Sequence, residues 1–302
     1  MSTPGPLYTA EGWYQALRCP EFVAYLAAGC PTLGAGRSEL LAARRTLWQT
    51  SLITEILSSQ TNDGDWPAFP PDGGERLWYR QFPIPLSVLC EAGFSLDDQP
   101  VRRASARLLS SLDDGVFRNP WREIDEPLEY YEAHNGNCLE AAGRCGLGGH
   151  PRVQRAVEVA LAHQRWDGGW STIPVTKARA ADKAKGVASC PICTAHMVRG
   201  LSYAARLSEA TIERILTYRL DERWGGQPED AIPELLLLLE FLARQGRRRD
   251  DPHVQRLFAR LESARNGDGA FLPHLSGRGW YPPEYTQVMF EYLRWWFGDL
   301  TP

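Results

Sequence analysis

The chain has no long hydrophobic run. Its longest stretch of leucines, Leu235 to Leu239, lies between Glu234 and Glu240, whereas a membrane-spanning helix needs about 20 apolar residues. The first residues also lack the basic stretch followed by an apolar one that marks a signal peptide. We therefore predict no transmembrane segment and expect a cytoplasmic protein.

An excess of positive charge is also missing. The chain has 33 Lys and Arg against 37 Asp and Glu, a net charge of -4 and a pI near 5.9. The basic run at residues 246–249 is followed directly by Asp250 and Asp251, which is typical of a solvated turn. Without a basic surface, nucleic acid is not an expected partner.

Paired cysteine spacings are scarce. Seven cysteines, an odd number, are spread over 302 residues. This distribution favours reduced thiols over a disulfide framework, which agrees with a cytoplasmic location.

One motif recurs along the chain. Residues 60–66 and 164–170 both follow the pattern Q-x-x-D-G-x-W, and degenerate copies begin at positions 111, 221 and 265, so the copies are 44 to 57 residues apart. A repeat of this length predicts an array of identical supersecondary units. The glutamine amide is expected to bind free groups at a helix end while it stacks on the tryptophan.

Strand patterns are nearly absent, and helical periodicity is strong. Amphipathic helices are predicted at residues 40–57, 101–112, 151–164 and 253–261, each ending near a repeat turn. A second set of predicted helices is apolar nearly all round, which indicates burial on every side. These helices lie at residues 83–89, 198–205, 232–242 and 288–297, and one more begins at residue 139.

The alternation of the two sets predicts an all-α fold, an α/α toroid of about five helical hairpins. Outer helices would form its surface, and inner helices would surround a central cavity. An open solenoid is the alternative, but its helical repeats are shorter, about 34 to 47 residues. We expect a single domain over residues 1–302, with a capping helix at 8–29 and a lid or mobile loop at 171–187.

The Q-x-x-D-G-x-W turns resemble the QW repeats of squalene-hopene cyclase, oxidosqualene cyclase and the related protein prenyltransferase toroids. The chain is also similar to a branch of bacterial squalene-cyclase-like proteins, on Gly136-Asn137, residues 147–156, Asp167 to Trp170, and Ser189-Cys190. The resemblance implies the terpenoid cyclase type of fold with a central cavity. It does not specify a reaction.

Class II terpene cyclases carry a D-x-D-D motif whose middle Asp protonates an alkene or epoxide. The matching segment here is Gln227-Pro-Glu229-Asp230, with Gln227 in place of the first Asp. Glu229 or Asp230 is therefore the candidate general acid, and Glu284, at another inner-helix start, is a further candidate. The alternative is that these carboxylates complement the dipole of a helix N-terminus.

A second candidate site combines thiols and an imidazole. Cys190, Cys193 and His196 lie at three-residue spacing at a helix start, and Cys138 lies on the preceding inner helix. Such a set could hold zinc, and protein prenyltransferases hold a catalytic zinc at the cavity wall, although their ligand spacing is not reproduced here. Buried structural cysteines are the alternative.

Five residues are candidates for substrate binding. His134 and Asn137 interrupt a buried helix, where a polar group needs a partner or a use. Tyr131, Trp280 and Tyr285 could stabilise a carbocation through their π faces, or could simply pack in the core.

Three hypotheses follow. The first is a terpene-cyclase-like enzyme that binds an apolar, isoprenoid-type substrate and starts its cyclisation or isomerisation with an acid. The second is a zinc-dependent enzyme with the Cys and His site at the cavity rim. The third is a non-catalytic toroid that binds a lipid or a protein. The class I motif D-D-x-x-D is absent from suitable helix positions, so ionisation of a diphosphate is not expected, and the oligomeric state is left open.

Overall fold

Helices form nearly all the regular structure in the part of the chain that this computed structural model describes, namely residues 19–29, 36–66, 82–118, 132–171, 189–223, 231–267, 269–271, 274–276, 279–281 and 283–298. The helices are α2 (Pro20–Gly29), α3 (Arg37–Trp48), α4 (Ser51–Ser59), α5 (Ile84–Glu91), α6 (Gln99–Ser110), α7 (Glu132–Arg144), α8 (Pro151–Ala162), α10 (Pro191–Ala204), α11 (Glu209–Leu216), the short 3-10 helix η3 (Leu220–Glu222), α12 (Ile232–Arg244), α13 (Pro252–Ser263) and α14 (Pro283–Trp296).

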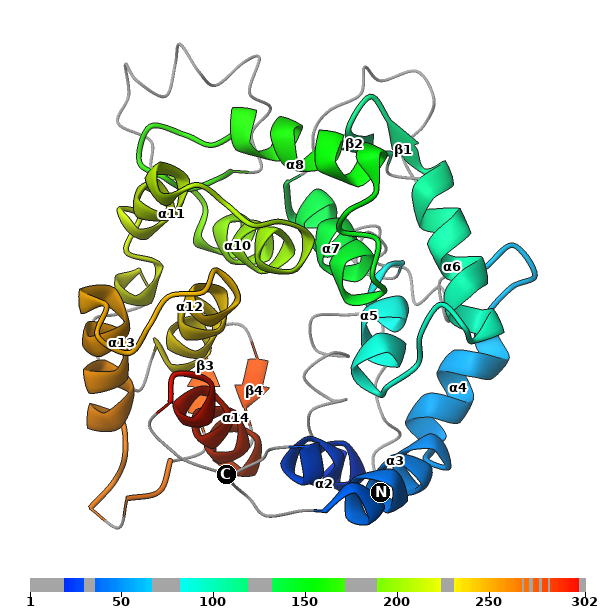
Figure 1. Cartoon of the computed structure of the whole chain (residues 1–302), viewed down its shortest axis with the longest axis horizontal. Coiled ribbons are helices and arrows are strands. Elements are labelled where there is room, and N and C mark those ends of the chain that lie inside the picture. The colour runs from blue at the N-terminus through cyan, green and yellow to red at the C-terminus, as the bar shows by residue number, and fades with distance from the viewer. Residues whose placement is uncertain are drawn as a thin grey trace.

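The helices form a ring of two layers (Figure 1). The inner layer consists of α5, α7, α10, α12 and α14, and the outer layer consists of α3 with α4, α6, α8, α11 and α13. Five outer–inner pairs therefore follow one another in the described residues, and the predicted all-α toroid is confirmed. The outer helix α11 was absent from the predicted set; it buries Ile212, Ile215 and Leu216 against the inner layer.

Two details differ from the sequence expectation. The single helix predicted at residues 40–57 is divided into α3 and α4, because Thr50 caps α4: its hydroxyl accepts a hydrogen bond from the Ile53 amide at 3.5 Å. Two short antiparallel hairpins also occur. One pairs β1 (Leu112–Asp113) with β2 (Val116–Phe117), and the other pairs β3 (His274–Ser276) with β4 (Gly279–Tyr281).

The two full repeat turns have the same geometry. The indole nitrogens of Trp66 and Trp170 donate to the carbonyls of Ile56 and Ala160, ten residues earlier in each case, at 2.7 and 2.9 Å. Both carbonyls lie in the last turn of an outer helix, where the intrahelical donors run out, although the Ala160 carbonyl also accepts from the His163 amide at 3.2 Å. The tryptophan, rather than the glutamine, therefore satisfies the helix end.

The glutamines of the repeat have other partners. The Gln60 amide donates to the Pro100 carbonyl in the next outer helix at 2.9 Å, whereas the Gln164 amide donates to Gly168 within its own turn at 2.8 Å. The expectation that the glutamine binds a free helix end is thus corrected.

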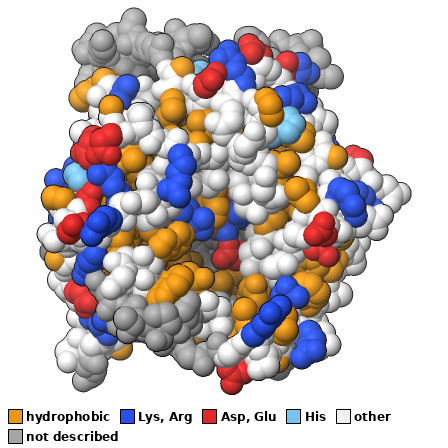
Figure 2. Space-filling model, in the orientation of Figure 1, with side chains coloured by type: hydrophobic (Ala, Val, Ile, Leu, Met, Phe, Trp, Pro, Cys, Tyr) orange, Lys and Arg blue, Asp and Glu red, His pale blue; other side chains and the backbone are white. Residues whose placement is uncertain are grey.

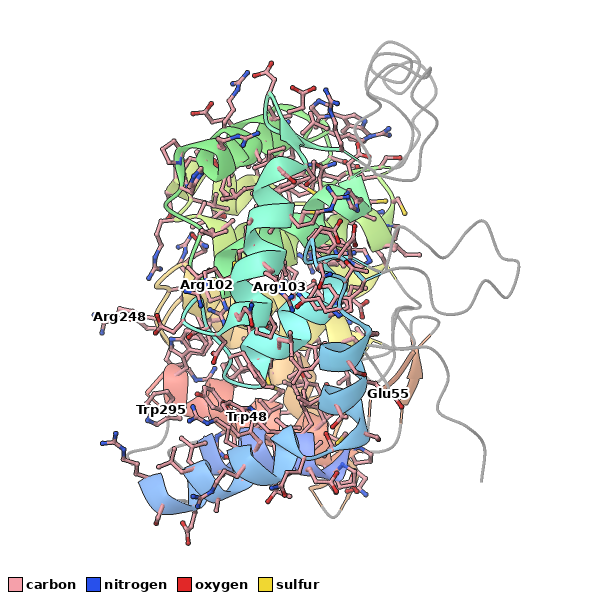
Figure 3. The ribbon with its side chains drawn as sticks, turned by 90° about the vertical axis from the view of Figure 1, so that its right-hand side faces the viewer. Trp48, Glu55, Arg102, Arg103, Arg248 and Trp295 are labelled. Carbon is pink, nitrogen blue, oxygen red and sulfur yellow. The ribbon has the colours of Figure 1, made fainter. Side chains whose placement is uncertain are left out.

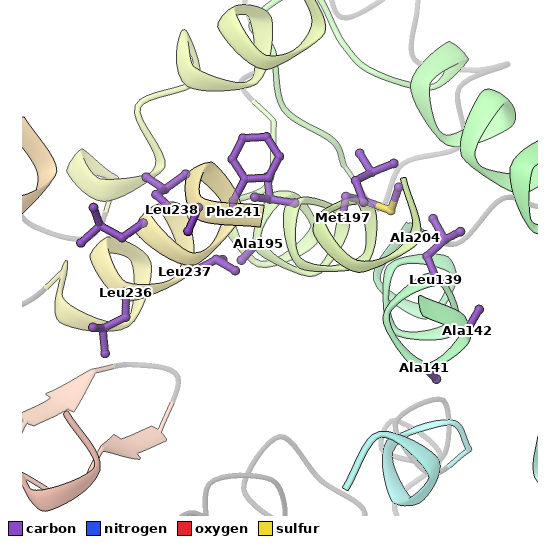
Figure 4. Packing of buried hydrophobic residues seen from close by; sticks show 14 of the residues in the cluster. Leu139, Ala141, Ala142, Ala195, Met197, Ala204, Leu236, Leu237, Leu238 and Phe241 are labelled. Carbon is purple, nitrogen blue, oxygen red and sulfur yellow. The ribbon is translucent and has the colours of Figure 1, made fainter. Parts of the chain in front are cut away.

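The inner helices α7 and α10 approach each other backbone to backbone. A side chain at Gly136 would lie 2.6 Å from the His196 backbone, and one at Gly143 would lie 2.4 Å from the Tyr203 backbone. Residue numbers rise together on both helices, so the two helices are parallel. Figure 4 shows this part of the core, with Leu236 and Ala141 pointing toward the middle of the ring and Phe241 toward the outer helices.

Helix α2 packs against both α3 and α14, at the place where the last hairpin meets the first (Figure 1). It forms the described part of the predicted capping helix at 8–29; residues 8–18 lie outside the described residues, as do residues 172–188, which contain nearly all of the predicted lid. Among the described helices, none is long and apolar enough to cross a membrane.

Candidate functional site

The inner helices begin together at one end of the ring and finish together at the other. Glu91 and Arg144 pair across the last turns of α5 and α7, and Tyr203 donates to Glu240 across the last turns of α10 and α12. We call the end where the inner helices begin the N-terminal mouth and the opposite end the C-terminal mouth. Figure 3 shows the ring from the side, with Trp295 and Arg248 toward one face and Glu55 toward the other.

Of the predicted acids, only Glu284 lies in the described residues. Glu229 and Asp230 lie just before α12 and outside the described residues. Glu284 lies in the first turn of α14 and is exposed.

The aromatic candidates are spread over separate elements. Tyr131 lies outside the described residues. Trp280 lies in β4, where its backbone pairs with Leu275, and its side chain is not described. Tyr285 is half-buried in the first turn of α14. The described residues do not bring these three side chains together as a pocket.

The polar candidates on α7 are all buried. The Asn135 side chain accepts a hydrogen bond from the Phe117 amide in the outer hairpin at 2.9 Å. Asn137 follows two residues later, about 200° further around the helix, so it faces the middle of the ring. It is 6% exposed, and its amide nitrogen has no hydrogen-bond partner among the described residues. His134 Nε2 lies 3.5 Å from Cys138 Sγ.

The predicted metal ligands do not converge. No group of three His, Cys, Asp or Glu side chains close enough to hold a metal ion occurs in the described parts of the chain. Cys190 precedes α10 as its N-cap residue in extended backbone, so helical spacing relates only Cys193 and His196, and a three-residue step on a helix turns the side chain by about 60°. Burial also raises the pKa of the Cys138 thiol, which disfavours the thiolate that binds zinc. The zinc site stays a prediction, and the described residues give it no support.

Glu132 is a candidate that the sequence reasoning missed. It opens α7, is 1% exposed, and its Oε2 has no hydrogen-bond partner among the described residues. Burial raises the pKa of Glu132 to about 8, against a smaller lowering by Arg165. The carboxyl is therefore protonated at neutral pH, between the starts of α7 and α10. Its position directly before the polar run at 133–137 was the available signal.

The C-terminal mouth carries a network of charged side chains that the sequence reasoning also missed. Glu140 and Arg144 on α7 pair at 2.9 Å, and Glu240 and Arg244 on α12 pair at 3.0 Å. Arg144 also pairs with Glu91. The signal was a Leu-Glu-x-x-x-Arg pattern repeated at the end of two otherwise apolar helices.

Tyr203 on α10 lies at the centre of this network. The guanidinium carbons of Arg144 and Arg244 lie 4.0 and 3.6 Å from the centre of its ring. Burial raises the pKa of Glu140 to about 7. Burial also acts to raise the pKa of Glu240, but Arg244, Arg144 and the Tyr203 hydroxyl outweigh it and leave that pKa lowered.

A pocket of about 600 Å³ opens beside this network. Its walls come from α2, α3, α5, α10, α12 and α14, and include Glu91, Glu240, Arg244 and the rings of Trp295 and Trp296. Figure 2 shows acidic and basic side chains around the hollow at the centre of this face. The two mouths thus differ. At the N-terminal mouth an oxygen of the Glu132 carboxyl has no hydrogen-bond partner among the described residues, whereas the charges named above at the C-terminal mouth are paired.

Comparisons with known proteins give a fold and no family. No protein-family model matches the chain, and no curated protein matches its sequence. Among solved structures, the chain is similar to ent-copalyl diphosphate synthase from Streptomyces platensis, with a TM-score of 0.50 and 19% identity over 92% of this chain and 50% of that one. A protein from Actinoplanes also matches, with a TM-score of 0.47 and 16% identity over 91% and 88% of the two chains. The chain therefore spans half the length of the synthase, and shares with it the terpenoid-cyclase type of helical fold.

Proposed function

We propose that this chain is an enzyme that binds an apolar, isoprenoid-type substrate inside the ring and starts its cyclisation or isomerisation by proton transfer. Within its fold type, we place it with the squalene-cyclase-like proteins on the basis of the Q-x-x-D-G-x-W turns. The observation that carries the proposal is the buried carboxyl of Glu132 at the start of the inner helix α7, which its raised pKa keeps protonated.

The inner surface of the ring suits a hydrocarbon. The inner helices α10 and α12 consist mostly of apolar residues, and apolar surface of this kind binds apolar ligands without specific hydrogen bonds. Asn137 on α7 supplies one polar group, and its free amide hydrogens can donate to a substrate oxygen.

The acidity of Glu132 restricts the reaction. A carboxyl with a pKa of about 8 stays protonated at neutral pH, but it is a weaker acid than an ordinary glutamic acid. Proton transfer from Glu132 therefore suits an epoxide oxygen better than a plain alkene, which demands a stronger acid. Glu229 and Asp230 are the alternative donors, since their sequence matches the acid motif of the cyclases.

The test is turnover of linear isoprenoids, offered as hydrocarbons, epoxides and diphosphates, in ordinary and in heavy water. Protonation of an alkene carbon places one solvent deuterium on carbon in the product, whereas protonation of an epoxide oxygen gives a hydroxyl group whose deuterium exchanges with water. We expect Glu132→Gln to abolish turnover of an epoxide while the far-ultraviolet circular dichroism spectrum stays unchanged. Glu229→Gln, made separately, tests the other donor in the same way.

The matched control is Glu284→Gln, which changes an exposed carboxyl at another inner-helix start and is expected to leave turnover unaltered. Full activity in both the Glu132→Gln and Glu229→Gln variants would overturn the proposed acid. A product formed from a hydrocarbon without carbon-bound solvent deuterium would exclude protonation of an alkene.

A further inference from the structure

The pocket at the C-terminal mouth is separate from the proposed site of protonation. Four of the inner helices, α7, α10, α12 and α14, have 13 or 14 residues, which corresponds to about 20 Å at 1.5 Å per residue. A pocket at that distance from Glu132 has no part in proton transfer, so its lining requires a separate explanation.

One wall of the pocket is aromatic. Tyr292, Trp295 and Trp296 reach it from α14, and Tyr25 reaches it from α2. The rings of Tyr292 and Trp295 meet edge to face, with their centres 5.9 Å apart. Trp296 keeps 38% of its surface exposed, although so large a ring is ordinarily covered. The π faces of such a wall attract cations.

The charged side chains that line the pocket are Glu91, Glu240 and Arg244, which gives the lining a net charge of -1. Arg244 already pairs with Glu240 at 3.0 Å and lies over the rings of Tyr203 and Trp296 at 3.6 and 5.3 Å. An anion would have to compete for Arg244 with the carboxylate of Glu240, which lies four residues earlier on the same helix. A cation would approach two carboxylates that already pair with Arg144 and Arg244. The aromatic wall supplies the further attraction, since the guanidinium over Trp296 shows that this wall holds positive charge.

We propose that this pocket binds an organic cation, a quaternary or protonated amine, between the aromatic wall and the carboxylates of Glu91 and Glu240. The ligand class follows from ring faces and carboxylates meeting in one pocket, which is the combination that recognises alkylammonium groups. The proposal is independent of the proposed enzyme reaction, since it concerns binding at the opposite mouth.

The test is equilibrium dialysis of the full chain against radiolabelled choline. We expect retention of choline, and no displacement by the alcohol of the same shape in which carbon replaces the charged nitrogen. Inorganic phosphate is also expected to leave the bound choline unchanged. Trp295→Leu and Trp296→Leu should each weaken choline binding about fivefold, the effect of losing one ring face.

The control is Trp166→Leu, because Trp166 is 57% exposed, belongs to the turn after α8, and does not line this pocket. Its binding should equal that of the unchanged chain. The proposal fails if choline is not retained, or if the uncharged alcohol displaces choline as well as choline itself does. Unchanged binding in both pocket variants, with folding verified by circular dichroism, would also overturn it.

Discussion

Glu132 combines a potential use in catalysis with a cost to stability. The carboxyl is removed from water at the start of α7, and one of its oxygens has no donor among the described residues. A buried acid in this state remains neutral, because ionisation in apolar surroundings is unfavourable. Stability that is given up at one residue in this way is typical of functional sites.

The stability of the chain should therefore depend on pH through Glu132. The pKa of this carboxyl is about 8 in the folded chain, against an ordinary value of 4.5 for glutamic acid in water. Between these values the unfolded chain loses the proton while the folded chain keeps it, so stability falls as the pH rises through the window. Burial of Glu140, with a pKa raised to about 7, acts in the same direction.

Glu132→Gln should remove its share of this loss. We compare the free energy of unfolding of the variant with that of the unchanged chain. This difference should shift in favour of the variant by on the order of a few kcal/mol between about pH 5 and about pH 8. Urea unfolding of both proteins at the two pH values measures the shift. An equal difference between the two proteins at both pH values would contradict the raised pKa.

At the scale of single residues, the sequence identified part of the candidate site. It singled out His134 and Asn137 because polar residues stand out in an apolar helix, and both are buried on α7. It missed Glu132 and the Glu140–Arg144 pair because a charge near a helix end is usually solvated. Whether such a charge is buried depends on the neighbouring helices, which lie far away in the sequence.

The repeat turns act at the scale of elements by joining each hairpin to the next. Gly64 and Gly168 both have φ of +87°, and a side chain at either position would overlap the backbone of the following outer helix, at Arg103 and Arg214. The glycine therefore permits both the turn and the close approach of α6 or α11.

Substitution at two of these turns separates the two effects. Gly168→Ala would place a methyl group 2.0 Å from the Arg214 carbonyl oxygen, whereas at Gly269, with φ of +77°, the nearest atom is the end of the Arg265 side chain at 3.6 Å. We expect a loss of about 1 kcal/mol for Gly269→Ala, from backbone strain alone. Gly168→Ala should lose about 3 kcal/mol or more.

Unfolding in urea gives both free energies. Equal losses at the two glycines would mean that α11 can move away from the turn without cost. The D-G core of the motif was visible in the sequence, but the helix that it contacts was not, because α11 was absent from the predicted set.

At the scale of the whole molecule, α2 joins the last hairpin to the first. It contacts α3 and α14, and its Phe22 is fully buried in the common core. An open array of hairpins would leave its two terminal faces uncovered. Closure covers them and completes the pocket at the C-terminal mouth, to which Tyr25 contributes.

Phe22→Ala tests how much the closure contributes. Truncation of a fully buried phenylalanine should cost about 3 to 5 kcal/mol, while Leu41→Ala on α3, where the side chain is 40% exposed, should change stability by no more than about 0.5 kcal/mol. Thermal unfolding followed by tryptophan fluorescence and by circular dichroism measures both. A loss for Phe22→Ala as small as for Leu41→Ala would show that the ring does not depend on α2.

The sequence by itself determined the helical composition, the repeat and the order of outer and inner helices. These follow from local periodicity and turn chemistry, which act over a few residues. Only the tertiary structure decided that the inner helices lie parallel with their charged ends together, and that Glu132 lies away from water. Those properties depend on contacts between residues far apart in the chain, and the burial that sets a pKa or opens a pocket exists only once the ring is assembled.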